Sequence, residues 1–149
     1  MQNRMQRTLK GASAILNIYH TVTMATLKIS DLSVGDWVIC NGFKATIAGY
    51  NAESGSIQVL TKQKNKMWFG LDDIEPIPIT AEILDKNGFK CFCEDADTTL
   101  YGTPLCSIFH TKGTLRYKLY TPPASVVCWN IHQLQHALRL AGVDKEINL

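Results

Sequence analysis

The sequence has no long hydrophobic run. No stretch approaches the roughly 18 consecutive apolar residues that a membrane-spanning helix needs, so we expect no membrane association. Internal repeats and low-complexity tracts are also missing. The residue patterns of a Ser/His/Asp triad, a P-loop and a Rossmann glycine turn are absent as well. These absences argue against membrane proteins, common hydrolases and nucleotide-binding enzymes.

Basic and acidic residues nearly balance over most of the chain, so neither sign of charge dominates. The 149 residues carry a formal net charge of +2, with 15 basic and 13 acidic side chains. Arg4, Arg7 and Lys10 are the only charged residues among the first 24, and without them 12 basic residues face 13 acidic ones. The remaining net charge of −1 argues against a broad phosphate-binding surface.

The cysteines form no even-numbered set from which a disulfide framework could be built. The chain is long enough to bury a hydrophobic core without covalent staples. We therefore expect reduced thiols in a cytoplasmic protein, packed as small hydrophobic side chains. The sequence has five of them: Cys40, Cys91, Cys93, Cys106 and Cys128.

The first 23 residues differ from the rest. A basic start followed by a short apolar patch suggests a signal peptide, but Asn17, Tyr19 and His20 interrupt the patch and no small-x-small cleavage site follows. We expect residues 1–23 to be a disordered or spurious extension, with translation starting at Met24.

Residues 24–79 have the pattern of a small β-barrel. Trp37–Cys40 alternates in the manner of a strand, and Asn41-Gly42 is a strong signal for a type I′ hairpin turn. Ser56–Thr61 and Met67–Leu71 form a second apolar pair. Four short strands in so few residues predict a twisted, SH3-like barrel.

Residues 80–149 predict a small α+β subdomain. Thr80 caps a short helix, and a helix from Asn130 to about Ala141 begins with a capping-box-like Asn130/Gln133 pair and ends at Gly142. Asp95 to Gly102 reads as a polar loop. We expect an antiparallel sheet of three or four strands, packed with both helices. Its segments are the helix Ala81–Lys86 and the strands Phe89–Glu94, Leu105–His110, Leu115–Tyr120 and Ser125–Trp129.

The last helix has two distinct sides at 100° per residue. Leu134 and Leu138 lie on the apolar side, which we expect to anchor the helix to the sheet. His132, His136 and Arg139 gather on a more polar side, where we expect the loss of both histidines to cost about 1 kcal/mol or less.

These motifs together resemble a known group. Residues 34–78 look like an SH3-like barrel of the Tudor or KOW type. The resemblance rests on the opening Val-Gly-Asp-Trp-Val, the Asn-Gly hairpin and the final Asp-Asp-Ile-Glu-Pro-Ile-Pro. With Asn87-Gly88-Phe89 and the helix His-Gln-Leu-Gln-His-Ala-Leu-Arg at 132–139, the chain resembles small uncharacterised bacterial and phage proteins. The resemblance covers residues 27 to the end and implies a fold without a chemistry.

The sharpest chemical pattern is the pair His132 and His136. Two histidines at i and i+4 on a helix can reach one Zn²⁺, but a zinc protease also needs a glutamate at position 133 to take a proton from bound water. Gln133 stands there, and an amide is no base. We expect no metal, no cofactor and no enzyme, with a degenerate zinc-binding protein or metallohydrolase as the alternative.

A second chemical pattern, made of cysteines, is Cys91-Phe92-Cys93. Residues two apart on a strand share a face, so these thiols are predicted neighbours. Zinc knuckles use two intervening residues, and Cys106, Cys128 and His110 could join only if the fold brings them together. We expect buried thiols here rather than a metal site.

Aromatic and basic side chains give the last pattern. Trp37 is expected in the core, and the neighbours Trp68 and Phe69 cannot both point inward from one strand, so one should be exposed. Tyr50 could join a groove on the barrel. Three lysines alternate at a predicted hairpin tip before Trp68, where they keep an edge soluble or contact phosphate: Lys62, Lys64 and Lys66.

The sequence therefore predicts a non-catalytic binding or adaptor module. A protein partner or neighbouring domain is favoured over nucleic acid, and the alternative is a nucleic-acid-associated accessory protein that uses the lysines with Trp68. The candidate binding residues are Lys62, Lys64, Lys66, Trp68, His132, His136 and Arg139.

Overall fold

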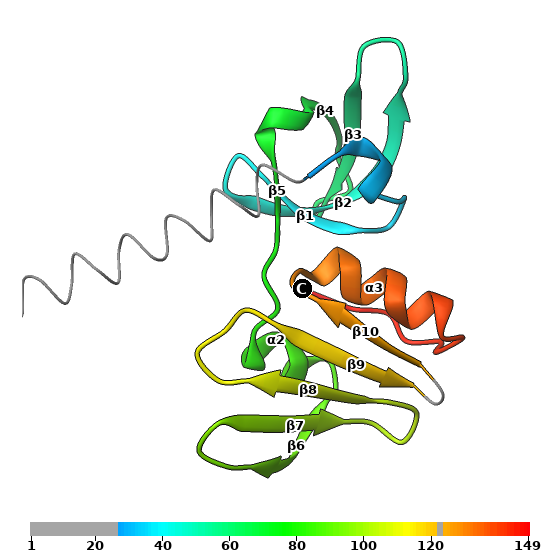
Figure 1. Cartoon of the computed structure of the whole chain (residues 1–149). Coiled ribbons are helices and arrows are strands. Elements are labelled where there is room, and N and C mark those ends of the chain that lie inside the picture. Colours follow the sequence, from blue (N-terminus) through cyan, green and yellow to red (C-terminus); the bar gives the residue numbers. More distant parts are fainter. Residues whose placement is uncertain (1–26, 122–123) are drawn as a thin grey trace, which may run out of the picture.

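The computed structural model describes residues 27–121 and 124–149, and the predicted extension and start at Met24 lie outside these residues. The described chain forms two five-stranded antiparallel sheets and two α-helices, an α+β arrangement (Figure 1). No helix among these residues is long and apolar enough to cross a membrane.

The first half of the chain forms the N-terminal sheet, in the order β4-β3-β2-β1-β5. Asn41 and Gly42 adopt positive φ angles of 45° and 85°, which confirms the predicted turn between β1 and β2. A β-bulge between Ile47 and Gly49 bends β2. The sheet is open at β4 and β5, so the closed SH3-like barrel stays a prediction. Its elements are 3₁₀ turn η1 (Ile29–Asp31), β1 (Trp37–Cys40), β2 (Phe43–Asn51), β3 (Ser56–Thr61), β4 (Lys66–Gly70), 3₁₀ turn η2 (Leu71–Asp73) and β5 (Ile74–Pro76).

The second half forms the C-terminal sheet, in the order β10-β9-β8-β7-β6. It follows helix α2, which begins after Thr80, whose Oγ1 accepts a hydrogen bond from the Ile83 N–H as predicted. Its elements are α2 (Ala81–Lys86), β6 (Lys90–Glu94), β7 (Thr98–Gly102), β8 (Ser107–Thr111), β9 (Tyr117–Thr121), β10 (Ala124–Cys128) and α3 (Ile131–Leu140).

Strand β7 corrects the prediction of a polar loop, and the C-terminal sheet has five strands rather than three or four. The Asp95 carboxylate accepts hydrogen bonds from the N–H groups of Asp97 and Thr98, both at 2.8 Å. Those bonds turn the chain within a few residues, which leaves Thr98–Gly102 free to pair with β6 and β8. They also hold the pKa of Asp95 below its ordinary value.

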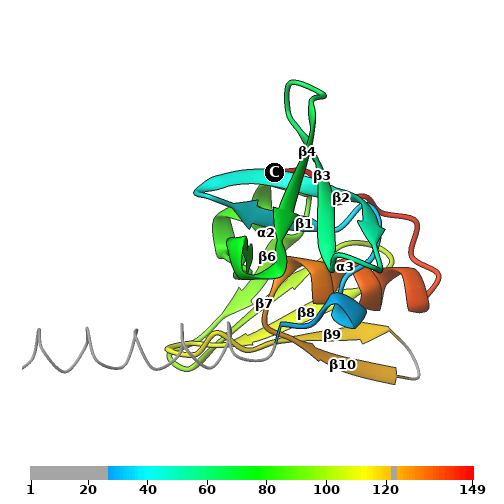
Figure 2. The same cartoon turned by 90° about the horizontal axis from the view of Figure 1, so that it is seen from above.

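Helix α3 lies between the two sheets (Figure 1), and Figure 2 shows it layered on strands β8–β10. Asn130 and Gln133 form the predicted capping box, and Gly142 ends the helix at φ 70°. The predicted anchors Leu134 and Leu138 are buried in the core between α3 and the C-terminal sheet. The segment between β5 and α2 pairs with the start of α3, because the Ile131 N–H donates to the Ile77 carbonyl at 2.8 Å.

The segment 143–149 returns from α3 to the core. Val143, Ile147 and Leu149 are buried. Asn148 exchanges hydrogen bonds with Asn87, which accepts from the Asn148 N–H at 2.8 Å and donates to its carbonyl at 3.0 Å. The segment therefore forms a fixed wall beside α3.

Candidate functional site

A buried carboxylate lies where the N-terminal sheet meets α3. Asp36 directly precedes β1 and its side chain is fully buried. Gly35, at φ 92°, turns the chain so that Asp36 Oδ2 accepts the Ser33 N–H at 2.7 Å. The Asp36 carbonyl also accepts the Ile47 N–H at 2.9 Å, which ties this loop to β2.

The remaining hydrogen-bonding capacity of Asp36 is used by α3. His136 Nε2 lies 2.6 Å from Oδ2, and Arg139 Nη2 donates to Oδ1 at 2.8 Å. Positions 136 and 139 are one turn apart, so both side chains leave the helix on the same side. We name Asp36, His136 and Arg139 the junction clamp, because they join the N-terminal sheet to α3.

His132 lies beside the clamp and corrects a prediction. It was expected on the polar side of α3, but its side chain is buried, with 3 % of the residue exposed. The N-terminal sheet covers this side of the helix, which a helical wheel drawn from the sequence does not reveal. The His132 ring is 6.1 Å from that of His136, and its Nδ1 has no hydrogen-bond partner among the described residues.

The burial of His132 predicts a pH dependence of stability. Burial lowers its pKa below the ordinary 6.5, more than the nearby Asp36 carboxylate raises it, and the neighbouring His136 lowers it further. As the pH falls through 6.5 the unfolded chain takes up a proton that the folded chain resists, so stability should decline as the pH is lowered through this value.

The variant His132→Leu isolates this contribution. We expect its free energy of unfolding, measured by urea melts on both sides of pH 6.5, to fall less steeply than that of the natural chain. Titratable groups remote from position 132 are present in both proteins, so their contributions cancel in the comparison. Equal slopes in the two proteins would show that His132 titrates alike in the folded and unfolded chain.

The clamp is also a poor place for a metal. Nε2 of His136, one of the two atoms of that ring able to bind zinc, is directed at Asp36. Within residues 27–121 and 124–149, no three His, Cys, Asp or Glu side chains are placed to hold a metal ion. His132 is thus a buried packing residue and His136 a clamp residue, and the structure does not assemble the cysteines with His110.

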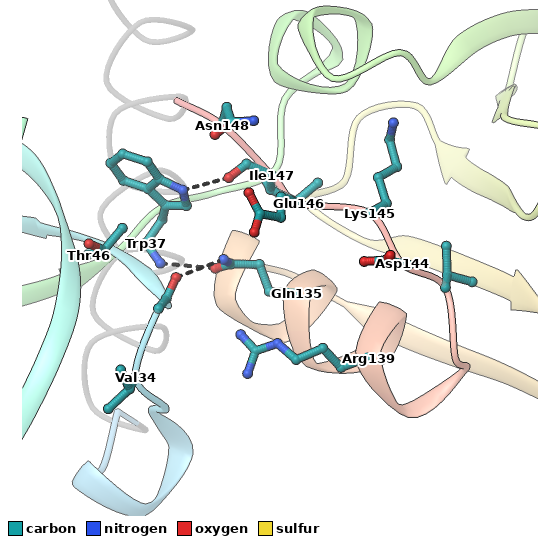
Figure 3. Close-up of a pocket in the computed structure, with 12 residues that line it drawn as sticks. Val34, Trp37, Thr46, Gln135, Arg139, Asp144, Lys145, Glu146, Ile147 and Asn148 are labelled. Carbon is teal, nitrogen blue, oxygen red and sulfur yellow. Dashed lines mark hydrogen bonds between the residues drawn. The ribbon is translucent and has the colours of Figure 1, made fainter.

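A glutamine and a tryptophan complete the junction. Gln135 Oε1 accepts the Trp37 N–H at 2.9 Å, and its Nε2 donates to the Gly35 carbonyl at 3.1 Å. The indole Nε1 of Trp37 donates to the Ile147 carbonyl at 2.7 Å (Figure 3). Trp37 is half-buried. Its ring packs against the C-terminal core, and the two hydrogen bonds hold it there.

These contacts surround a cleft of about 510 Å³ at the junction. Figure 3 shows Arg139 on one wall and Asp144 and Glu146, from the segment after α3, on another. Lys145 points away and its Nζ lies 5.3 Å from the centre of the Phe89 ring. The cleft is lined by Val34, Gly35, Trp37, Thr46, Gln135, Arg139, Val143, Asp144, Lys145, Glu146, Ile147 and Asn148.

No protein family, curated protein or solved structure in our comparisons matches this chain. The resemblance to small bacterial and phage proteins therefore stays a prediction. Any function assigned to the chain must come from its own geometry.

The lysine group lies elsewhere. Lys62 and Lys64 belong to the turn between β3 and β4, and Lys66 begins β4. Trp68 is 52 % exposed on this edge strand, whereas its neighbour Phe69 packs against Phe43 with ring centres 6.0 Å apart. The prediction that one of the two aromatics is exposed is confirmed. None of the lysines nor Trp68 lines the cleft.

The cysteine predictions hold in part. Cys40, Cys106 and Cys128 are buried as expected, but Cys91 and Cys93 are exposed on the edge strand β6. The β-bulge between them pairs Cys91 with Tyr101 and Cys93 with Leu100. Leu100 and Tyr101 are adjacent in β7 and face opposite sides of the sheet, so their partners Cys93 and Cys91 also face opposite sides. The prediction that the two thiols share a face is wrong.

Thiol labelling in the native protein should reflect this division. We expect a thiol-reactive dye to label two of the five cysteines, Cys91 and Cys93, before denaturant is added. Burial raises the pKa of Cys40 to about 11 and that of Cys128 to about 12, so neither is a thiolate at neutral pH. Mass spectrometry of the labelled peptides identifies the sites, and rapid labelling of Cys40 or Cys128 would contradict the fold.

Proposed function

We propose that this chain is a non-catalytic binding module whose ligand site is the cleft at the junction. Its buried titratable cluster supports this reading. Asp36 is fully enclosed and three donors occupy its oxygens, so it cannot reach a substrate as a base. His136 is directed at the same carboxylate. Because these side chains bond to one another rather than face the cleft, the cluster serves to position the elements around it.

The cleft is preformed by hydrogen bonds between distant parts of the chain, and this feature is the main support for the proposal. Two parts of the chain that are far apart in the sequence form it: residues 34–46, from the loop before β1 to β2, and residues 135–148, from α3 and the segment that follows it. Gln135 and Trp37 fix these segments to one another through hydrogen bonds. A preformed concavity of about 510 Å³ has the size of ligand-binding sites in proteins.

The walls favour an extended peptide of a protein partner. The cleft combines cationic and anionic side chains, and its wall at 143–148 is a segment that belongs to neither sheet. Val34 is 59 % exposed at the rim and supplies an apolar contact. Extended peptides use backbone hydrogen bonds for affinity and side-chain pockets for selectivity.

An SH3-like assignment of residues 24–79 fits this function. The strand order β4-β3-β2-β1-β5 is a meander whose last short strand returns beside the first, and that order supports the assignment. Barrels of this type bind peptides, nucleic acids or neighbouring domains, so the assignment alone selects none of them.

Nucleic-acid binding at the β3–β4 turn is the second candidate function. Exposed Trp68 on the strand that follows the lysines supports it, since a stacking ring next to cations suits a single strand. Salt-dependent retention on a DNA or RNA column, lost in a Lys62→Gln/Lys64→Gln/Lys66→Gln variant, separates it from peptide binding.

A displayed library of random dodecapeptides tests the cleft. Peptides enriched on the immobilised chain should bind the natural protein and lose at least about tenfold in affinity, by fluorescence anisotropy, when Thr46→Arg fills the cleft. Glu53→Arg adds the same side chain in the β2–β3 turn and should bind normally. An empty library, or peptides that bind Thr46→Arg as well as the natural protein, would refute the proposal.

A further inference from the structure

The outer face of the C-terminal sheet, opposite α3, presents aromatic and basic side chains. Cross-strand register places Cys93, Leu100, Phe109, Lys118 and Val127 in one row across all five strands. A neighbouring row runs through Gly102, Ser107 and Tyr120. The single row between them runs through Tyr101, Ile108 and Leu119, which are buried on the other side.

Three aromatic rings stand on this outer face. Phe92 is 66 % exposed and Tyr120 is 43 % exposed, while Phe109 is half-buried in the centre of the sheet. Phe92 lies directly over Gly102, where a Cβ would come within 2.3 Å of its ring. The glycine therefore allows the ring to cover the sheet surface, which leaves its other side to solvent.

The charged side chains that line a depression on the outer face are both cationic. Arg116, Phe109, Thr111, Lys118 and Tyr120 line a shallow depression of about 180 Å³. Lys118 Nζ lies 5.3 Å from the centre of the Tyr120 ring. Glu94 is the only carboxylate in strands β6–β10, and it is paired with Thr99 in a row of the opposite face and bridged by Lys112 at 2.8 Å.

We propose that the outer face binds single-stranded nucleic acid. Unpaired bases stack on exposed aromatic rings, and cations placed between those rings neutralise the phosphates that connect the bases. The face supplies both, with Arg116 and Lys118 beside the rings and no carboxylate among the residues that line the depression. A net charge near zero over the folded part limits the interaction to this patch and argues against wrapping of duplex DNA.

The site differs from the peptide cleft and from the lysine turn. It lies on the side of the C-terminal sheet away from α3, and no residue lines both hollows. Its residues are surface positions on strands, so they can be changed without opening the core. This makes the three surfaces separable in one set of variants.

Fluorescence anisotropy with a 5′-labelled deoxythymidine 12-mer tests the proposal on the full chain. We expect binding that weakens as salt rises, and a loss of roughly tenfold in affinity for Tyr120→Ala, the usual effect of removing one stacking ring. Arg116→Gln/Lys118→Gln should reduce the slope of log K against log salt by about 0.7 per lost phosphate contact.

Matched variants decide where the strand binds. Trp68→Ala and Lys62→Gln/Lys64→Gln/Lys66→Gln remove the same side-chain types elsewhere and should leave the affinity within about twofold. The proposal fails if the 12-mer does not bind, if the lysine-turn variants lose affinity instead, or if sedimentation shows that the face pairs with a second copy. Far-UV circular dichroism of Tyr120→Ala confirms that its loss of binding is not a loss of fold.

Discussion

Alanine at Leu134 or Leu138 should lower the free energy of unfolding by about 2–5 kcal/mol, a large part of the stability of a domain of this size. Both side chains are fully buried between α3 and the C-terminal sheet. Truncation removes their apolar surface from the core and leaves a cavity. Urea melts followed by circular dichroism measure the effect.

Leu140→Ala provides the control on the same helix. Leu140 is 88 % exposed, so its truncation should change the free energy of unfolding by less than about 0.5 kcal/mol. Similar losses at positions 138 and 140 would mean that α3 is rotated relative to the sheet, which would remove the basis for the clamp as well.

The second large effect is expected at Asp36. Asp36→Ala removes the acceptor of three hydrogen bonds, one from the Ser33 N–H and two from the clamp side chains. We expect a loss of about 3 kcal/mol, because bonds to charged groups are strong and removal of one partner leaves the others unpaired. His136 and Arg139 keep side-chain exposures of 30 % and 49 %, and water reduces their share of the loss.

Urea melts of Asp36→Ala and Asp97→Asn measure this effect against an exposed aspartate in the turn before β7. The latter should remain within about 0.5 kcal/mol of the natural protein. In a chain whose other tryptophans, Trp68 and Trp129, are replaced by Phe, Trp37 fluorescence follows the junction, since its indole is bonded to segment 143–149. If Asp36→Ala were as stable as the natural chain, the clamp would make no net contribution to joining the sheets.

Local patterns predicted the elements of α3 and of the β1–β2 hairpin. The Asn130/Gln133 pair and the Asn41-Gly42 turn act over a few residues, so their residue types alone determine the conformation. The apolar period likewise identified Leu134 and Leu138 as core positions. Strand β7 was missed because the polar Asp95–Asp97 turn was read together with the strand that follows it.

The site could not be predicted in the same way. Asp36 contacts residues 100 and 103 positions away, and no period or spacing encodes such a contact. The signal that was available is a carboxylate within the apolar opening Val34–Val38, together with a His/Arg pair on a helix that lacks acidic neighbours. The cleft depends on segment 143–149, which has no regular secondary structure and gave no pattern to read.

A double-mutant cycle between Asp36 and Arg139 tests most directly that the clamp joins the two sheets. Asp36→Asn, Arg139→Gln and the double variant are compared by urea melts at pH 7. The contact at 2.8 Å predicts a coupling free energy on the order of 1–3 kcal/mol, with the double variant less destabilised than the two single losses together. A coupling free energy near zero would show that the two residues do not interact in solution, and the junction would have to be held by other contacts.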